Sequence, residues 1–141
     1  MNKKKQTKNL GPRGNDAKAL EAVIGGIEEC RAKPPYDYQR IIICHTNSPS
    51  LGPELARRSG AALAGPVCPL DLKCAPAVVI VEKAGDCSPE MLESIVIFIN
   101  RTRGVVVLLA AAETFAGWRV RWRIPADQIR RRTHLTIQFD R

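Results

Sequence analysis

Residues 40–44 read Arg40-Ile41-Ile42-Ile43-Cys44, a short apolar run without the polar alternation of a half-exposed strand. Two similar runs follow, at 77–81 and 105–109. Runs of this kind are typical of strands that are buried on both faces of a parallel sheet. Because segments with helix signals separate the three runs, the sequence predicts an α/β fold with a mostly parallel central sheet.

The segments around these runs carry the helix signals. Asn15 or Asp16 can cap a helix over about 15–32, in which Gly25-Gly26 indicates close packing against the sheet or a kink. A second helix is expected over about 53–63. The clearest start is Ser88-Pro89-Glu90, which opens a helix that Gly104 would end. Helices on both faces predict a three-layer sandwich, and residues 64–76, with three prolines, predict an irregular connection with a short extended piece near Val67.

The C-terminal third shows a different pattern, strict alternation of apolar and polar residues. One such segment is 118–124, and a second is 134–139. Alternation predicts half-buried strands, so we expect these two segments to form an antiparallel strand pair at the edge of the sheet. The apolar positions of the first segment are Trp118, Val120, Trp122 and Ile124, and Arg119, Arg121 and Arg123 lie between them.

The chain of 141 residues is predicted to hold a flexible basic arm, residues 1–14, and a single α/β domain, residues 15–141. It has no apolar run long enough to span a membrane, and no apolar stretch follows the basic N-terminus, so we expect no membrane segment and no secretory signal. Five cysteines without a C-x-x-C pair argue against a disulfide framework and against a zinc site. These features predict a cytoplasmic protein in a reducing compartment, with structural thiols and no metal or cofactor.

The net charge of +8 is concentrated at the two ends of the chain. Residues 101–141 contain nine arginines and no lysine, whereas the N-terminal arm uses mostly lysine. Arginine grips phosphate with a planar fork, and lysine suits a mobile arm. The sequence therefore predicts docking to nucleic acid or another polyanion. The predicted contact residues are Arg101, Arg103, Arg119, Arg121, Arg123, Arg130, Arg131, Arg132, Lys3, Lys4 and Lys5.

Two other interpretations of these arginines stay open. Charged side chains protect edge strands from aggregation, and an acidic protein partner would also suit a basic strand. Trp118 and Trp122 lie opposite the arginines of the predicted strand and are expected in the core. This placement argues against base stacking by these rings and favours contacts to the phosphate backbone or to nucleic-acid shape.

A second candidate site is the crevice at the carboxyl ends of the parallel strands, where ligands bind in open α/β sheets. The loop after the first strand leads into a helix N-terminus, whose free amides attract anions. The loop at 82–86 would converge on the same place. The predicted crevice residues are His45, Thr46, Asn47, Ser48, Glu113 and Thr114.

Two local resemblances bear on this crevice. Ile41-Ile42-Ile43-Cys44-His45-Thr46 resembles the strand–Cys–helix segment of caspase-like cysteine peptidases, although no histidine precedes Cys44. Val78-Val79-Ile80-Val81-Glu82-Lys83 resembles the first strand of Toprim domains, which carries a metal-linked glutamate, but the later Asp-x-Asp is missing here. An enzyme would use His45, Cys44 and Glu82.

The leading hypothesis is a non-enzymatic nucleic-acid-binding α/β protein that docks through an Arg-rich strand and a Lys-rich arm. The alternative is a small hydrolase or nucleotide-binding protein that uses the loop His45–Ser48. A third hypothesis is a module for protein interaction or assembly, including a homo-oligomer. The phosphate loops G-x-G-x-x-G and G-x-x-x-x-G-K-[ST] are absent from the sequence.

Overall fold

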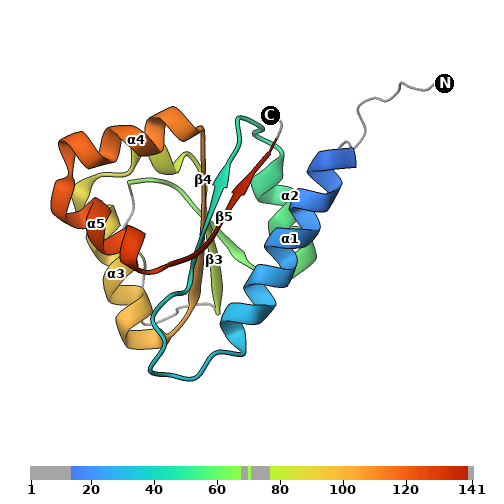
Figure 1. The fold of residues 1–141 in the computed structure, drawn as a ribbon, viewed down its shortest axis with the longest axis horizontal. Helices are drawn as coiled ribbons and strands as arrows, with labels where there is room; N and C mark the ends of the chain where they lie inside the picture. Colours follow the sequence, from blue (N-terminus) through green and yellow to red (C-terminus); the bar gives the residue numbers. More distant parts are fainter. Residues whose placement is uncertain (1–13, 68–69, 71–76, 140–141) are drawn as a thin grey trace.

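A computed structural model of the chain describes residues 14–67, 70 and 77–139. Its centre is a five-stranded sheet with the strand order β2-β3-β4-β1-β5, and every paired neighbour is parallel. Helices cover both faces, which gives three layers (Figure 1). The elements are α1 (Gly14–Arg31), β1 (Ile41–His45), α2 (Leu51–Ser59), β2 (Ala62–Ala64), β3 (Val78–Val81), η2 (Ala84–Asp86), α3 (Pro89–Thr102), β4 (Val105–Ala110), α4 (Ala112–Arg121), α5 (Arg123–Arg131) and β5 (Thr133–Gln138).

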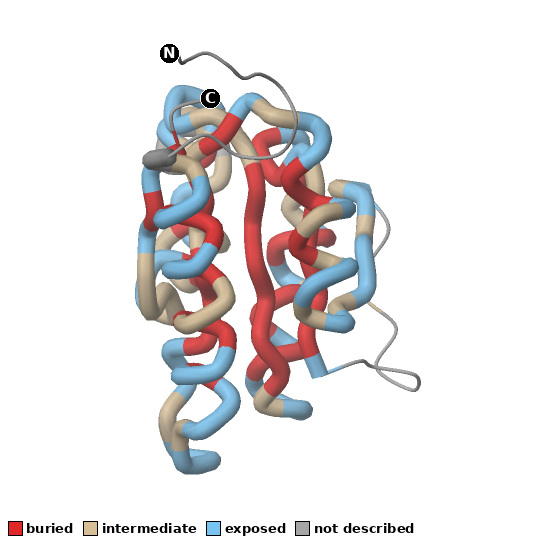
Figure 2. The backbone as a smooth tube through the Cα atoms, turned by 90° about the vertical axis from the view of Figure 1, so that its right-hand side faces the viewer, coloured by how far each residue is buried: buried red, intermediate tan, exposed pale blue. Residues whose placement is uncertain are grey.

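The three predicted buried strands are confirmed as β1, β3 and β4. They are neighbours in the sheet, with Ile42 of β1 opposite Val107 of β4, and Ile80 of β3 opposite the same residue on its other side. Figure 2 shows the buried backbone concentrated in this central layer, with exposed segments on the outer helices. Continuous apolar runs are what a strand needs when both its faces are covered.

Each face of the sheet has its own hydrophobic core. On one face α1 and α2 pack through Leu20, Val23 and Leu55, and on the other face α3 packs through Met91 and Phe98; all five side chains are almost fully buried. Close packing explains one of the two glycines in α1. A Cβ on Gly26 would lie 3.0 Å from Leu135 and 3.1 Å from Ile42, whereas a Cβ on Gly25 would meet nothing within 4 Å.

The predicted antiparallel strand pair is wrong. Residues 118–124, predicted as a strand, belong to the end of α4 and the start of α5. The second segment does form a strand, β5, but β5 pairs parallel to β1 at the edge of the sheet. The apolar residues explain the error, because Phe115, Trp118 and Trp122 also fit one face of a helix. Trp118 is buried and Trp122 packs against the same core, while Ile124 is 72% exposed.

The second predicted helix ends earlier than expected. α2 stops at Ser59, and Gly60 caps it in the left-handed conformation with a φ of 73°. The chain then forms the short edge strand β2, which the sequence did not predict. The predicted arm, residues 1–14, lies outside the described residues except for Gly14, which begins α1. None of the described helices is long and apolar enough to cross a membrane.

The start of α3 agrees with the prediction, and its end differs in one respect. The hydroxyl of Ser88 accepts a hydrogen bond from the amide of Met91 at 3.1 Å, as an N-cap should. At the other end Arg103, rather than the glycine after it, takes the left-handed cap conformation, with a φ of 59°. Gly104 is needed for space, because a Cβ there would collide with the ring of Phe98.

Candidate nucleic-acid interface

The loop between α1 and β1 is organised by one buried cation, Arg40, which is 3% exposed. Its guanidinium donates five hydrogen bonds, with N···O distances of 2.8–3.1 Å, and all five acceptors are backbone carbonyls. Arg40 therefore ties the loop to the C-terminal ends of α1 and α3. The carbonyls belong to Cys30, Lys33, Pro34, Asp37 and Arg103.

Arg103 extends this organisation to the surface. Its guanidinium lies over the ring of Tyr38, 4.2 Å from the ring centroid, and donates a hydrogen bond of 2.7 Å to the Tyr38 hydroxyl. It also donates to the backbone carbonyls of Pro35 and Asn100. A left-handed backbone costs a non-glycine residue about 1 kcal/mol or more. Arg103 adopts this conformation where its side chain can reach the loop.

Arg132 contacts the C-terminal end of α3 from the end of α5. It follows α5, and it donates to the side-chain oxygen of Asn100 at 3.3 Å and to the Gln128 carbonyl at 3.1 Å. Asn100 thus accepts hydrogen bonds from both Arg103 and Arg132. The ends of α3 and α5 are joined by these contacts at the end of the sheet where the strands begin.

The acceptors around Arg103 and Arg132 are neutral oxygens. Within the part of the chain that the structure describes, no carboxylate lies within ion-pair distance of either guanidinium. Neutral acceptors orient a guanidinium but leave its full positive charge. Arg132 has five N–H donors, and its two hydrogen bonds to Asn100 and Gln128 leave some of them available. Both side chains are therefore positioned cations without a counter-ion among the described residues.

Arg130 and Arg131 lie beside Arg132 and share one carboxylate, that of Asp127. The distances from Asp127 are 2.5 Å to Arg130 and 3.1 Å to Arg131. The hydrogen bond from Arg130 lowers the pKa of Asp127, so this carboxylate stays ionised at neutral pH. One negative charge thus faces two exposed positive charges. We call the five arginines at the C-terminal ends of α3 and α5 the arginine surface: Arg101, Arg103, Arg130, Arg131 and Arg132.

The other predicted contact residues are placed differently. Arg119 and Arg121 lie in α4, so the row of three arginines on one strand does not exist, and their side chains are outside the described set. Arg123 begins α5 and is exposed, and together with Arg130 and Arg131 it lines a groove of about 920 Å³ between α4, α5 and the strands β1 and β5. Lys3, Lys4 and Lys5 lie outside the described residues.

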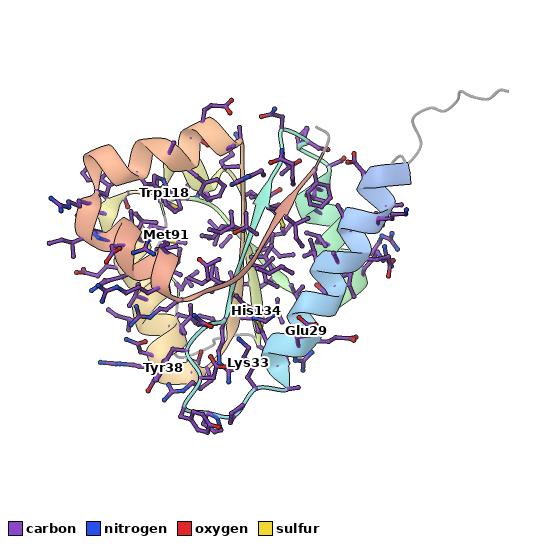
Figure 3. The ribbon with its side chains drawn as sticks, viewed as in Figure 1. Glu29, Lys33, Tyr38, Met91, Trp118 and His134 are labelled. Atoms are coloured by element: carbon purple, nitrogen blue, oxygen red, sulfur yellow. The ribbon has the colours of Figure 1, made fainter. Side chains whose placement is uncertain are left out.

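Exposed aromatic residues next to the arginine surface were missed in the sequence interpretation. Tyr36 and Tyr38 lie in the α1–β1 loop and are 80% and 39% exposed. Figure 3 shows Tyr38 and Lys33 at the lower end of the view, away from Trp118, which lies near the upper helices. The available signal was the run Pro34-Pro35-Tyr36, because a helix-ending proline pair places the next residue in a surface loop.

The predicted crevice at the opposite end of the sheet exists, with a volume of about 520 Å³. It contains part of the predicted set together with residues after β3, and His45 and Glu113 are not among its lining residues. His45 lines the groove instead, where its Nδ1 lies 3.2 Å from the Gln138 side-chain oxygen and its ring packs on Phe115. The predicted residues that do line the crevice are Thr46, Asn47, Ser48 and Thr114, joined by Glu82 and Asp86.

Glu82 limits what the crevice can bind. Its carboxylate lies against Gly52 in the first turn of α2, so close that a Cβ on Gly52 would be 2.5 Å from the carboxylate oxygen Oε2. The N-terminal turn of a helix favours negative charge. The Glu82 carboxylate therefore places a negative charge beside this turn, which disfavours a second anion there.

The candidate catalytic residues do not come together. Cys44 is fully buried on the α1–α2 side of the sheet, whereas His45 follows it on β1 and lies on the groove side. Burial raises the pKa of the Cys44 thiol to about 12, so this thiol is not a nucleophile at neutral pH. The resemblance to cysteine peptidases therefore finds no support in the geometry.

Comparison with known proteins identifies a fold. No protein-family model and no curated protein matches the chain. Similar solved structures include a Streptococcus pyogenes protein described as a "putative primosome component", with 12% identity, a TM-score of 0.55, and 91% of this chain and 81% of that chain covered. The ORC2 protein of Aeropyrum pernix, solved in ADPNP–ADP complexes, also has 12% identity and a TM-score of 0.55.

The second comparison covers 94% of this chain and 50% of the ORC2 chain. The chain therefore spans half of that larger protein. At 12% identity both comparisons establish a shared α/β fold with a parallel sheet flanked by helices.

Proposed function

We propose that the protein binds nucleic acid without catalysing a reaction, and that the arginine surface is the docking site. The observation that carries this proposal is that Arg103 and Arg132 are held in place by neutral oxygens. Clustered like charges repel one another in the free protein. A phosphate backbone would neutralise the cluster and release counter-ions, which favours binding.

The shared fold is compatible with this function. The two similar structures are named as a "putative primosome component" and an ORC2 protein, and such names are associated with DNA replication. Their names do not specify a residue in this chain, so the argument for the site rests on the arginines. Arg119, Arg121 and Arg123 in α4 and α5 would extend the contact along the helices, and the Lys-rich arm would add charge.

The alternative of nucleotide binding or hydrolysis is less well supported. It needs the crevice, and there Glu82 already places a negative charge at the N-terminus of α2. It also needs His45, which lines the groove and not the crevice. The geometry therefore favours the arginine surface over the crevice.

A triple variant tests the docking site. Arg130→Ala, Arg131→Ala and Arg132→Ala together should weaken binding to labelled DNA or RNA by roughly tenfold or more at low salt. The slope of log affinity against log salt should fall by about three, since three phosphate contacts are lost. Fluorescence anisotropy at several salt concentrations measures both quantities.

The matched control removes three cations elsewhere: Arg57→Ala, Arg58→Ala and Lys83→Ala. Arg57 and Arg58 lie in the last turn of α2, and Lys83 lines the crevice at the other end of the sheet. The control should bind within about twofold of the unaltered protein, because it removes the same number of positive charges but none from the arginine surface. If both triple variants weakened nucleic-acid binding equally, the effect would come from net charge alone, and the proposed docking site would be contradicted.

A further inference from the structure

The α1–β1 loop presents an aromatic ring that the fold does not use. Tyr36 is 80% exposed, the largest exposure among the described large hydrophobic residues. Tyr38, two residues further, is half covered because the Arg103 guanidinium lies on its ring. A ring that stays in water contributes nothing to the core, so its stability role is small.

This loop is held rigidly for a surface loop. Arg40 binds the carbonyls of Lys33, Pro34 and Asp37 from below, and Pro35 restricts the backbone directly before Tyr36. The Lys33 ammonium donates to the Gln39 carbonyl at 2.7 Å and closes the loop. The backbone around Tyr36 is therefore already ordered in the free protein. Binding would then cost little additional conformational entropy in this loop, which favours affinity.

Tyr36 also lies next to the arginine surface. The Arg103 side chain donates to the carbonyl of Pro35, the residue before Tyr36. A strand whose phosphates contact Arg103 would therefore run beside the loop that carries Tyr36. Aromatic rings beside a basic surface are how proteins hold single strands, because unpaired bases stack on the rings while cations contact the backbone.

We propose that Tyr36 is a stacking platform for an unpaired base and that the protein's ligand is single-stranded nucleic acid. In a duplex the base faces are stacked on one another and cannot reach the ring. This inference rests on the proposed function, since it needs the phosphates to lie on the arginine surface. The sequence favours backbone contacts because Trp118 and Trp122 are expected in the core, and the exposed Tyr36 adds a ring outside the core.

The test compares a labelled single strand with a duplex of the same length. Tyr36→Ala should weaken binding of the single strand by about fivefold or more and leave duplex binding within about twofold. Tyr36→Phe keeps the ring and should restore single-strand binding. Val67→Ala, at another exposed apolar residue, is the matched control and should have no effect. Since Tyr36 is exposed, all these variants should keep the unfolding temperature of the unaltered protein.

The outcomes separate the two proposals. If Tyr36→Ala binds the single strand normally while the Arg130/Arg131/Arg132 variant does not, the stacking platform is wrong and the docking site stands. If the unaltered protein prefers the duplex, the single-strand inference is also overturned. If the arginine variant binds as well as the unaltered protein, the proposed function itself fails.

Discussion

The two ends of the sheet differ in the sign of the charge that they present. At the end where the strands begin, Arg103 and Arg132 are oriented by carbonyl, amide and hydroxyl oxygens and keep their charge. At the end where the strands finish, Glu82 lies against the first turn of α2 and supplies the negative charge that this turn favours. We therefore expect the binding end of this sheet to be the end where the strands begin, and not the end with the crevice.

The largest effect should come from removing the cation that builds the basic end. Arg40→Ala leaves five carbonyls without their donor, and we expect the free energy of unfolding to fall by about 3 kcal/mol. Urea denaturation followed by circular dichroism measures this loss. Arg57→Ala, on the exposed surface of α2, should cost under about 1 kcal/mol.

A loss below about 1 kcal/mol for Arg40→Ala would show that water replaces the guanidinium. The loop that carries Tyr36 would then not be preorganised by Arg40. The comparison between the two ends would lose its structural basis.

A smaller effect is expected from the carboxylate on the basic end. Asp127→Asn removes the negative charge that faces Arg130 and Arg131, and nucleic-acid binding should tighten by about two- to fivefold at low salt. The pKa of Asp127 is already lowered by Arg130, so the native carboxylate is ionised throughout the neutral range and binding should not change with pH there. Weaker binding by Asp127→Asn would mean that Asp127 positions the arginines, and would contradict this account.

The smallest effect concerns the opposite end. Glu82→Ala clears the first turn of α2, and pyrophosphate should then raise the unfolding temperature by about 2 °C more than it does for the unaltered protein. Glu113→Ala, at an exposed glutamate that does not line the crevice, is the control and should show no such gain. Pyrophosphate stabilising the unaltered protein through the crevice would show that Glu82 does not fill the anion position.

The sequence predicted correctly those helices and strands whose residue pattern fits only one kind of secondary structure. The buried runs of β1, β3 and β4 and the capped start of α3 are confirmed. The strand prediction for 118–124 is wrong because the apolar residues of this segment fit both a strand and one face of a helix. Seven residues are too few to distinguish the two periodicities. The sequence did not predict strand β2, because β2 is three residues long and largely exposed and therefore has no hydrophobic pattern.

The candidate site was only partly predictable for a different reason. Composition marked the arginines of the last third, but their partners are distant in sequence, as with Arg103 and Tyr38 or Arg132 and Asn100. Arg40 stands at the start of an apolar run with no motif around it, although it binds carbonyls from the ends of two helices. Such contacts depend on the tertiary fold, and no local pattern encodes them.

The most direct test of the central claim is hydrogen exchange with and without a single-stranded oligonucleotide, read by mass spectrometry on the intact chain. The account predicts slower exchange in the loop 33–40 and at the ends of α3 and α5, with no change at 46–52 or 82–87. Protection at the crevice segments, with none around the arginine surface, would contradict it.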